Sequence, residues 1–355
     1  MSEFRLHTDD EVPEENSELY EHFRIVVDKG QALLRIDKFL MNRIENVSRN
    51  RIQQSAKAGN ILANGTVVKP NYKVKPGDIV TVVFSFPPRE VVIHPENIPL
   101  EVVYEDEHLI VINKQDNLVV HPGHGNFDGT LLNALAWHFG RNGNNPVENT
   151  FGYLVHRIDK DTTGLMIVAK NELAQTILAR QFFEHTIERR YHALVWGDLK
   201  SDSGTISGHI GRSLKDRRVM SVFPDGEYGK EAITHYQVLR RYGYVTLVEC
   251  RLETGRTHQI RAHFRYIGHP LFNDATYGGD AILKGTTFTK YKQFVENCFN
   301  IMARHALHAK TLGFKHPISG AMMKFDSPLP NDMQALIDKW EKYLQHRPLG
   351  EGDSD

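Results

Sequence analysis

The chain has 355 residues, 40% of them hydrophobic and 25% charged, which is the composition of a globular protein with about two or three domains. It contains no apolar run near the roughly 18 residues of a membrane-spanning helix. Its two cysteines, Cys250 and Cys298, lack the spacing of a disulfide framework or a structural zinc site, so we expect a protein of the reducing cytoplasm.

The net charge of −1 conceals an uneven distribution along the chain. Residues 1–23 contain eight acidic residues and one arginine, whereas residues 35–85 contain nine basic and three acidic residues. Because the first stretch has few large apolar residues and a dense run of like charges, we expect residues 1–22 to form a disordered acidic arm. Residues 346–355 are expected to form a disordered tail. The basic stretch has a charge pattern suited to a polyanion.

Residues 35–85 are predicted to form a small domain. Apolar residues recur at helical spacing from Arg35 to Ile44, and Ser48 can cap a second helix that ends near Gly59. Asn64-Gly65 lies between the β-prone runs 61–63 and 66–68, which predicts a hairpin, and residues 79–84 follow as a strand. The expected order of elements is therefore ααβββ.

Residues 86–99 are predicted to be a linker, since they include Pro87 and Pro88, and residues 100–345 are predicted to be one large domain with mixed helices and strands. Strand patterns are found at 101–104, 109–113, 165–170, 191–197, 232–239, 245–252 and 313–316. Helix patterns lie between them at 131–139, 172–184, 257–267 and 333–343. Periodicity does not give the order of the strands.

Three stretches of the large domain resemble the RluA family of RNA pseudouridine synthases, closest to its RluD-like branch. They are His156–Leu165 (HRIDKDTTGL), Arg189–Val195 (RRYHALV) and Thr254–His263 (TGRTHQIRAH). Ile158 stands where the family usually has leucine, and residues 281–300 are longer than its pattern. The small domain resembles an S4-type RNA-binding domain. The resemblance, which covers about residues 30–340, implies an α+β fold with a mixed, mainly antiparallel sheet and flanking helices, preceded by the S4-like ααβ domain.

Family members convert uridine to pseudouridine in structured RNA without a metal or a cofactor, so the resemblance implies that activity here. It assigns Asp159 as the catalytic carboxylate, Arg261 as its cationic partner and Tyr191 as the active-site tyrosine. A carboxylate can attack C1′, remove a ribose proton or stabilise a sugar cation, and the sequence leaves these three roles open. Asp161 is a competing carboxylate, whose side chain would share a face with Asp159 in an extended segment and diverge from it in a turn.

The target uridine must leave its stack, and residues beside the carboxylate are expected to hold the RNA when it does. His156 and Arg157 are the candidates, although His156 fits a structural hydrogen-bonding histidine equally well. In the small domain, the expected phosphate contacts are Arg35, Arg49, Arg51 and Lys57. We expect these side chains to bind phosphate because acidic residues are scarce in this domain.

The partner implied by the RluD-like branch is large-subunit (23S) ribosomal RNA, and a monomer without a small-molecule cofactor is expected. A synthase acting on transfer RNA and a non-catalytic RNA-binding factor of ribosome assembly remain alternatives. A metal-dependent hydrolase using Asp159, Asp161 and histidines is a weaker one. His258 and His263 are five residues apart, which does not place two histidines on one helical face as a zinc site of that kind requires.

Overall fold

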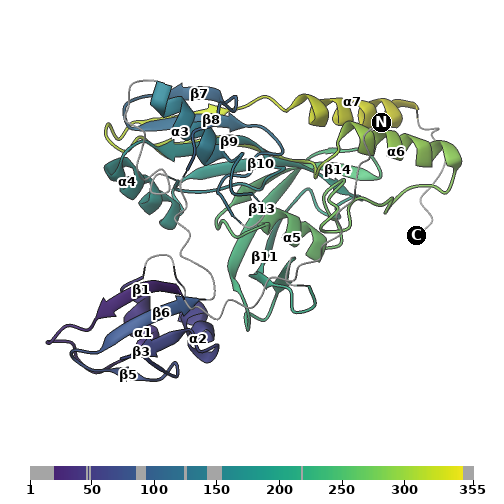
Figure 1. Ribbon diagram of the computed structural model, residues 1–355. Helices are drawn as coiled ribbons and strands as arrows, with labels where there is room; N and C mark the ends of the chain where they lie inside the picture. The colour runs from purple at the N-terminus through teal and green to yellow at the C-terminus, as the bar shows by residue number, and fades with distance from the viewer. Residues whose placement is uncertain are drawn as a thin grey trace, which may run out of the picture. The chain divides into compact units, whose positions relative to one another are not determined.

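The computed structural model describes residues 20–44, 47, 49–84, 93–123, 126–141, 154–216 and 219–346. The chain divides into two compact units, Met1–Val92 and Ile93–Asp355 (Figure 1). In the described ranges, no helix is both long enough and apolar enough for a membrane span. Four parts of the predictions lie outside the described residues: most of the acidic arm, residue 48, residues 85–92 (the end of the predicted small domain and the first part of the linker) and most of the tail.

The first unit packs two helices against a sheet. Helices α1 (Ile36–Met41) and α2 (Arg49–Lys57) share a core with the sheet. The sheet has the order β1-β6-β3-β4, and a second ladder pairs β2 with β5. The strands are β1 (Tyr20–Val26), β2 (Leu34–Arg35), β3 (Ile61–Ala63), β4 (Thr66–Val67), β5 (Lys73–Val74) and β6 (Ile79–Phe84). The predicted hairpin is confirmed: Asn64 and Gly65 connect β3 to β4 with φ angles of 51° and 76°, the left-handed conformation that a two-residue turn needs.

Strand β1 was not predicted. Residues 20–22 belong to it, so the prediction that the disordered arm extends to residue 22 is wrong for these three positions. β1 pairs antiparallel with β6 from Tyr20 opposite Phe84 to Val26 opposite Ile79. Val27, directly after the strand, is 1% exposed. The main-chain ladder and this burial outweigh the acidic composition of the segment, which had suggested disorder.

The second unit is built on one large sheet. Its order is β12-β11-β13-β14-β10-β15-β9-β8-β7, and β16 also pairs with β15. Only β9 and β15 run parallel among these neighbours, so the predicted mixed, mainly antiparallel sheet is confirmed. The strands are β7 (Glu101–Glu105), β8 (Leu109–Lys114), β9 (Thr163–Ala169), β10 (Glu188–Trp196), β11 (Ser203–Arg212), β12 (Met220–Phe223), β13 (Lys230–Arg241), β14 (Val245–Leu252), β15 (Leu307–Lys315) and β16 (Met322–Asp326).

Five helices of this unit are described: α3 (Leu131–Arg141), α4 (Glu172–Phe183), α5 (Gln259–Tyr266), α6 (Thr289–Ile301) and α7 (Asn331–His346). Helix α6 was not predicted and occupies most of the segment that is longer than the family pattern. It lies beside α7 (Figure 1). Tyr291, Val295 and Cys298 of α6 join Trp340 of α7 in one buried cluster. The extra length of this segment therefore builds core.

Two predicted boundaries of the large domain are corrected. Residues 93–99 were assigned to a linker, but Ile93 and Ile98 pack against the main core. The side-chain amide of Asn133 donates to the carbonyl of His94 at 2.8 Å, which ties this segment to helix α3. At the other end, His346 was assigned to the disordered tail but is the last residue of α7. Contacts to distant residues thus order residues 93–99, whereas His346 continues α7 and its ring lies 2.7 Å from the carbonyl of Lys342 in the same helix.

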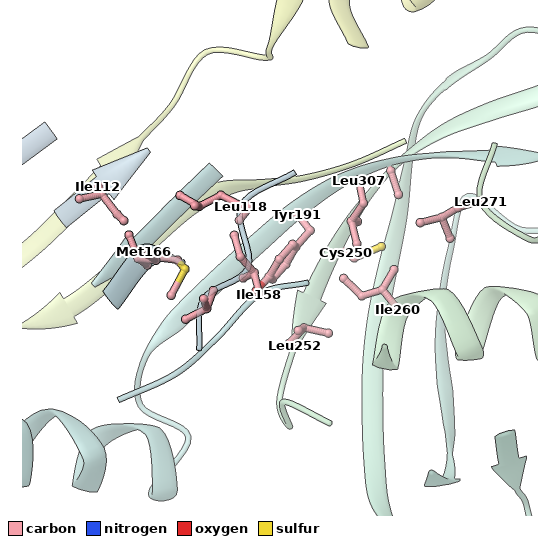
Figure 2. Packing of buried hydrophobic residues seen from close by; sticks show 14 of the residues in the cluster. Ile112, Leu118, Ile158, Met166, Tyr191, Cys250, Leu252, Ile260, Leu271 and Leu307 are labelled. Atoms are coloured by element: carbon pink, nitrogen blue, oxygen red, sulfur yellow. The ribbon is translucent and has the colours of Figure 1, made fainter. Parts of the chain in front are cut away.

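The central core of the second unit lies directly beside the loop that carries the HRID motif. Ile158 of that loop is 6% exposed and packs in the same cluster as Tyr191 of β10. Figure 2 shows these residues together with Cys250, which lies opposite Tyr191 in the pairing of β10 with β14. Because Ile158 is anchored in the core, the next residue, Asp159, is held at the edge of the core.

Candidate active site

A cleft of about 520 Å³ opens over this part of the second unit. Its walls come from the loop 155–162, the end of α4, strand β10 and helix α5. The three predicted catalytic residues, Asp159, Tyr191 and Arg261, all line it. So do His156 and Arg157, two of the predicted RNA contacts. The fold thus brings together residues that lie as much as a hundred positions apart in the chain.

Asp159 lies in a tight turn between the buried Ile158 and strand β9. The amide of Thr162 donates to the carbonyl of Asp159 at 3.1 Å, which closes the turn. The side chains of Asp159 and Asp161 therefore diverge, and Asp159 lines the cleft whereas Asp161 is absent from its lining. Gly164 follows with a φ of 114°, and a Cβ atom there would lie 2.3 Å from the carbonyl oxygen of Ala309. Glycine is required because β9 approaches β15 this closely.

Arg261 of α5 is the cation that faces Asp159. Its Nη1 donates to Asp159 Oδ2 at 3.1 Å, so the predicted ion pair forms. Its Nε and Nη2 donate to the two carboxylate oxygens of Asp274 at 2.7 and 2.9 Å. Burial by itself would lower the pKa of Arg261, but Asp274 and Asp159 raise that pKa above its ordinary value. The guanidinium is thus fixed by one carboxylate and presented to the other.

Tyr191 points into the cleft from the centre of β10. It is 7% exposed and belongs to the main core cluster. Burial raises the pKa of its phenol, an effect that the nearby Arg189 opposes and Asp159 reinforces. The hydroxyl therefore stays protonated at neutral pH and can donate a hydrogen bond inside the cleft. The ring presents an aromatic surface next to the carboxylate.

His258 is a further neighbour of Asp159, which the sequence did not single out for this role. It precedes α5 with a φ of 54°, a left-handed conformation that is uncommon for histidine. Tyr277 Oη accepts from the amide of Met220 and lies 3.0 Å from His258 Nδ1, so its own proton can go to that nitrogen. This leaves Nε2–H directed to Asp159 Oδ1 at 3.9 Å. Burial lowers the pKa of His258.

His156 has a structural environment. Its Nε2 accepts the amide hydrogen of Ile167 at 3.0 Å, and its ring stacks on Phe182 with centroids 4.6 Å apart. Burial lowers the pKa of His156 to about 3, so the ring is neutral, as this acceptor role demands. A direct RNA contact by His156 stays a prediction. Arg157, in contrast, is exposed at the cleft.

Two buried cations donate hydrogen bonds to the backbone of the turn that contains Asp159. Lys114 Nζ donates to the carbonyl of Lys160 at 2.8 Å and to that of Leu118 at 3.0 Å, which links two loops. Arg304 Nη1 donates to the carbonyl of Asp161 at 2.9 Å. The guanidinium of Arg304 also pairs with Asp332. The backbone of the two residues that follow Asp159 is thus anchored by charged groups.

The comparisons with known proteins agree with this geometry. Residues 108–266 match the family model described as RNA pseudouridylate synthase, and residues 34–80 match that of the S4 domain. An RNA pseudouridine synthase of Chlorobaculum parvum is 46% identical over 316 residues, which cover 88% of this chain and 96% of the relative. The chain belongs to the RNA pseudouridine synthases. It is an isomerase that acts on RNA.

Further relatives of this pseudouridine synthase have names that specify the RNA on which they act. The ribosomal large subunit pseudouridine synthase D of Zymomonas mobilis is 42% identical, over 85% of this chain and 92% of the relative. That of Vibrio vulnificus is 40% identical, over 91% of this chain and 96% of the relative. Among solved structures, human RNA pseudouridylate synthase domain containing 1 matches with a TM-score of 0.50 and 26% identity, over 72% of this chain and 97% of its own.

In the S4 domain of this synthase, the predicted phosphate contacts divide into two groups. Arg35 and Arg49 both pair with Asp37, whose side chain is completely buried, and their own side chains are 40% and 42% exposed. Burial alone would raise the pKa of Asp37, but hydrogen bonds from Arg35, Gln53 and Arg49 hold it well below its ordinary value. Asp37 therefore orients two partly exposed guanidinium groups.

The second group is Arg51 and Lys57 of helix α2, and Lys57 lines a groove of about 630 Å³ in the S4 domain. Arg35, Lys57 and Lys69 border it, so that Lys69, which the sequence analysis did not select, adds a cation. Lys57 is exposed at the end of α2, and Arg51 is exposed on the same helix. Several cations around one concave surface suit a nucleic-acid backbone.

Sequence reasoning missed several residues of this cleft: Phe183, Arg189, Arg256 and His258 among its walls, and Asp274 behind Arg261. Arg189 stands in the quoted RRYHALV motif, two residues before Tyr191, and residues so spaced on a strand share a face. That spacing was the available signal. Within the described ranges, no group of three or more histidine, cysteine, aspartate or glutamate side chains could hold a metal ion.

Proposed function

We propose that Asp159 is the catalytic carboxylate of this synthase and that it acts on a uridine drawn into the cleft from large-subunit ribosomal RNA. The observation that carries the proposal is the pairing of Asp159 with an arginine that is itself fixed by Asp274. The anchored guanidinium presents a positive charge to the Asp159 carboxylate and limits its orientation.

The reaction breaks the bond from uracil N1 to ribose C1′, turns the base and rejoins it through C5. Every atom stays in the nucleotide, so the site needs a carboxylate at the ribose, space for the base to turn and a group that handles the C5 proton. A cleft of about 520 Å³ has the size of a small-ligand site and accommodates a single nucleotide. Asp159 can attack C1′, remove a ribose proton or stabilise a sugar cation.

We assign Tyr191 to the base. Its ring can stack on the uracil, and its protonated hydroxyl lies among the same cleft residues as Asp159. Extrusion of the uridine costs a few kcal/mol of stacking, which contacts on the enzyme must replace. Arg157, exposed at the cleft, is the residue that we propose to contact the RNA beside the extruded nucleotide.

The target class is argued from the relatives and from the S4 domain. Relatives at 40–42% identity that align with most of this chain are named for the large ribosomal subunit. The groove bordered by Arg35, Lys57 and Lys69 supports a contact to an RNA backbone outside the active site. We propose 23S ribosomal RNA as the substrate, with the S4 domain supplying affinity and placement and the second unit supplying the chemistry.

The deciding experiment maps pseudouridine in ribosomal and transfer RNA from cells with and without the gene. Loss of particular sites from 23S RNA, restored by the wild-type chain and by Asp161→Asn but not by Asp159→Asn, is the expected result. Loss confined to transfer RNA would replace the proposed target. An unchanged map with defective ribosome assembly would favour a non-catalytic factor, and full restoration by Asp159→Asn would remove Asp159 from the chemistry.

We further propose that the enzyme works as a cytoplasmic monomer without a metal or a cofactor. The free, buried thiols of Cys250 and Cys298 suit a reducing compartment. Sedimentation of the purified chain tests the monomer, and fluorescence of a tagged chain in cells tests the compartment. Turnover that persists after dialysis against a chelator is expected, and loss of turnover restored by a metal would contradict it.

A further inference from the structure

One buried arginine of the cleft has no carboxylate partner among the described residues. Arg189 is 8% exposed. Its Nη2 makes a long hydrogen bond of 3.4 Å to the carbonyl of Glu253, and its guanidinium lies over the ring of Phe182 at 5.4 Å. Its Nε is buried and has no hydrogen-bond partner. A buried cation is normally paired, because removal of a charge from water is costly.

Other buried arginines of this unit show what a satisfied site looks like. Arg261 donates to both oxygens of Asp274, and Arg304 donates to both oxygens of Asp332. These two side chains are 7% and 6% exposed, close to the burial of Arg189. The fold therefore supplies a carboxylate to each of these two buried arginines, and among the described residues it supplies none to Arg189.

The position of Arg189 shows from which side an anion could approach it. Arg189 and Tyr191 are alternate residues of β10, both buried, and both line the cleft that contains Asp159. Gly255 opposite keeps space for the guanidinium, since a Cβ atom there would lie 2.7 Å from Arg189 Nη1. The anion must therefore reach Arg189 from the cleft itself.

We propose that Arg189 binds a backbone phosphate of the RNA next to the uridine that enters the cleft. The proposal rests on the function proposed above, because the phosphates are the anionic groups of an RNA substrate. A planar guanidinium with several donors matches the oxygens of a phosphate and can bind two of them at once. Bound RNA would then complete the hydrogen bonding of Arg189.

The test compares RNA binding of full-length variants in an Asp159→Asn background, so that no turnover disturbs the equilibrium. A transcript containing the modified region of 23S RNA is titrated at several KCl concentrations. Arg189→Met should weaken binding on the order of tenfold. It should also reduce the slope of log K against log [KCl] by about 0.7–0.9, the counterions released by one phosphate contact. Arg189→Lys should keep most of the slope, because it keeps the charge.

Arg190→Gln is the matched control. It lies on the same strand and loses the same charge, but its side chain faces away and pairs with Glu188 and Glu249. Its salt slope should equal that of the parent chain. Arg189→Met should also unfold at the same or a higher temperature than the parent, since it removes an unpaired buried charge. Weaker binding would then not result from loss of the fold.

An unchanged salt slope for Arg189→Met overturns the phosphate site. The same substitution is made in the chain that keeps Asp159, where turnover is measured. Lower turnover there with an unchanged salt slope would mean that Arg189 contacts a neutral carbonyl of the uracil, which also overturns the phosphate site. The target is checked separately by asking whether the wild-type chain modifies the 23S transcript. If it does not, the slope comparison is made on the RNA that loses pseudouridine in cells lacking the gene, so failure of the target and failure of the phosphate site are distinguished.

Discussion

Arg261 Nη1 lies 3.1 Å from Asp159 Oδ2, although 102 residues separate the two in the chain. The contact depends on Asp274, which is 1% exposed and holds the other side of the guanidinium. Asp159 and Asp274 are thus connected through one buried guanidinium. Because removal of one partner leaves a buried charge unpaired, the first prediction concerns Asp274.

Asp274→Asn should lower both the stability and the activity of the enzyme. The amide keeps the shape of the side chain but removes the charge that faces Arg261, so we expect a loss of about 3–5 kcal/mol in the free energy of unfolding. At temperatures where the variant remains folded, kcat should fall at least tenfold while KM changes little. Urea unfolding and single-turnover kinetics measure the two effects. Glu341→Gln, which breaks the exposed pair with Arg240, is the control and should change stability by less than about 1 kcal/mol.

The pH dependence of stability should reveal the buried histidine next to the catalytic loop. The pKa of His156 is about 3 in the folded chain against 6.5 for the free side chain, so the unfolded chain binds the extra proton first. The contribution of neutral His156 is complete above pH 6.5 and is lost as the pH falls toward 3. Through this group, the free energy of unfolding is about 2 kcal/mol lower at pH 5 than at neutral pH.

His156→Gln provides the comparison, because its amide oxygen can accept from the Ile167 amide and does not titrate. The variant should be less stable than the wild type at pH 7.5, and the gap should narrow as the pH is lowered to 5. Thermal unfolding at both pH values measures this. A gap that stays constant would show that His156 does not have a lowered pKa in the folded chain.

Gly164→Ala should be severely destabilising. The added methyl group would meet the Ala309 backbone at 2.3 Å, at a φ of 114° that alanine rarely adopts. Separation of β9 from β15 would follow, and with it displacement of the Asp159 turn, so we expect little soluble protein. Gly320→Ala is the matched control: its φ is also positive, at 68°, but nothing lies within 4 Å of the new atom. It should lose only about 1 kcal/mol. Equal yields of the two variants would contradict this account.

Removal of groove cations in the S4 domain should affect RNA binding and spare the chemistry. Lys57→Gln combined with Lys69→Gln should raise the RNA concentration required for half-maximal rate several-fold, most strongly at low salt. The rate at saturating RNA should stay within about twofold, because neither lysine belongs to the catalytic unit. Lys29→Gln, an exposed lysine outside the groove, is the control. A large loss of the saturated rate would show that the S4 groove takes part in catalysis.

The sequence determined those features that short stretches of chain encode. The Asn64-Gly65 turn, the paired helices of the small domain and most strands of the large sheet follow from local spacing, since turn and periodicity signals act over a few residues. The long motifs also indicated the family and the three residues now found around one cleft. Helix α6 was within reach as well, because Tyr291, Val295 and Cys298 recur at helical spacing.

Which of these groups come into contact depends on the three-dimensional fold. Neither the parallel pairing of β9 with β15 nor the addition of β1 to the first sheet can be read from periodicity, because strand order depends on contacts between distant segments. The same reason hides the fixation of Arg261 by Asp274, the approach of His258 to Asp159 and, within the described part of the chain, the lack of a carboxylate partner for Arg189. Each of these features depends on burial and on charged groups that folding brings close to one another. The order of residues along the chain does not show which of them become neighbours in space.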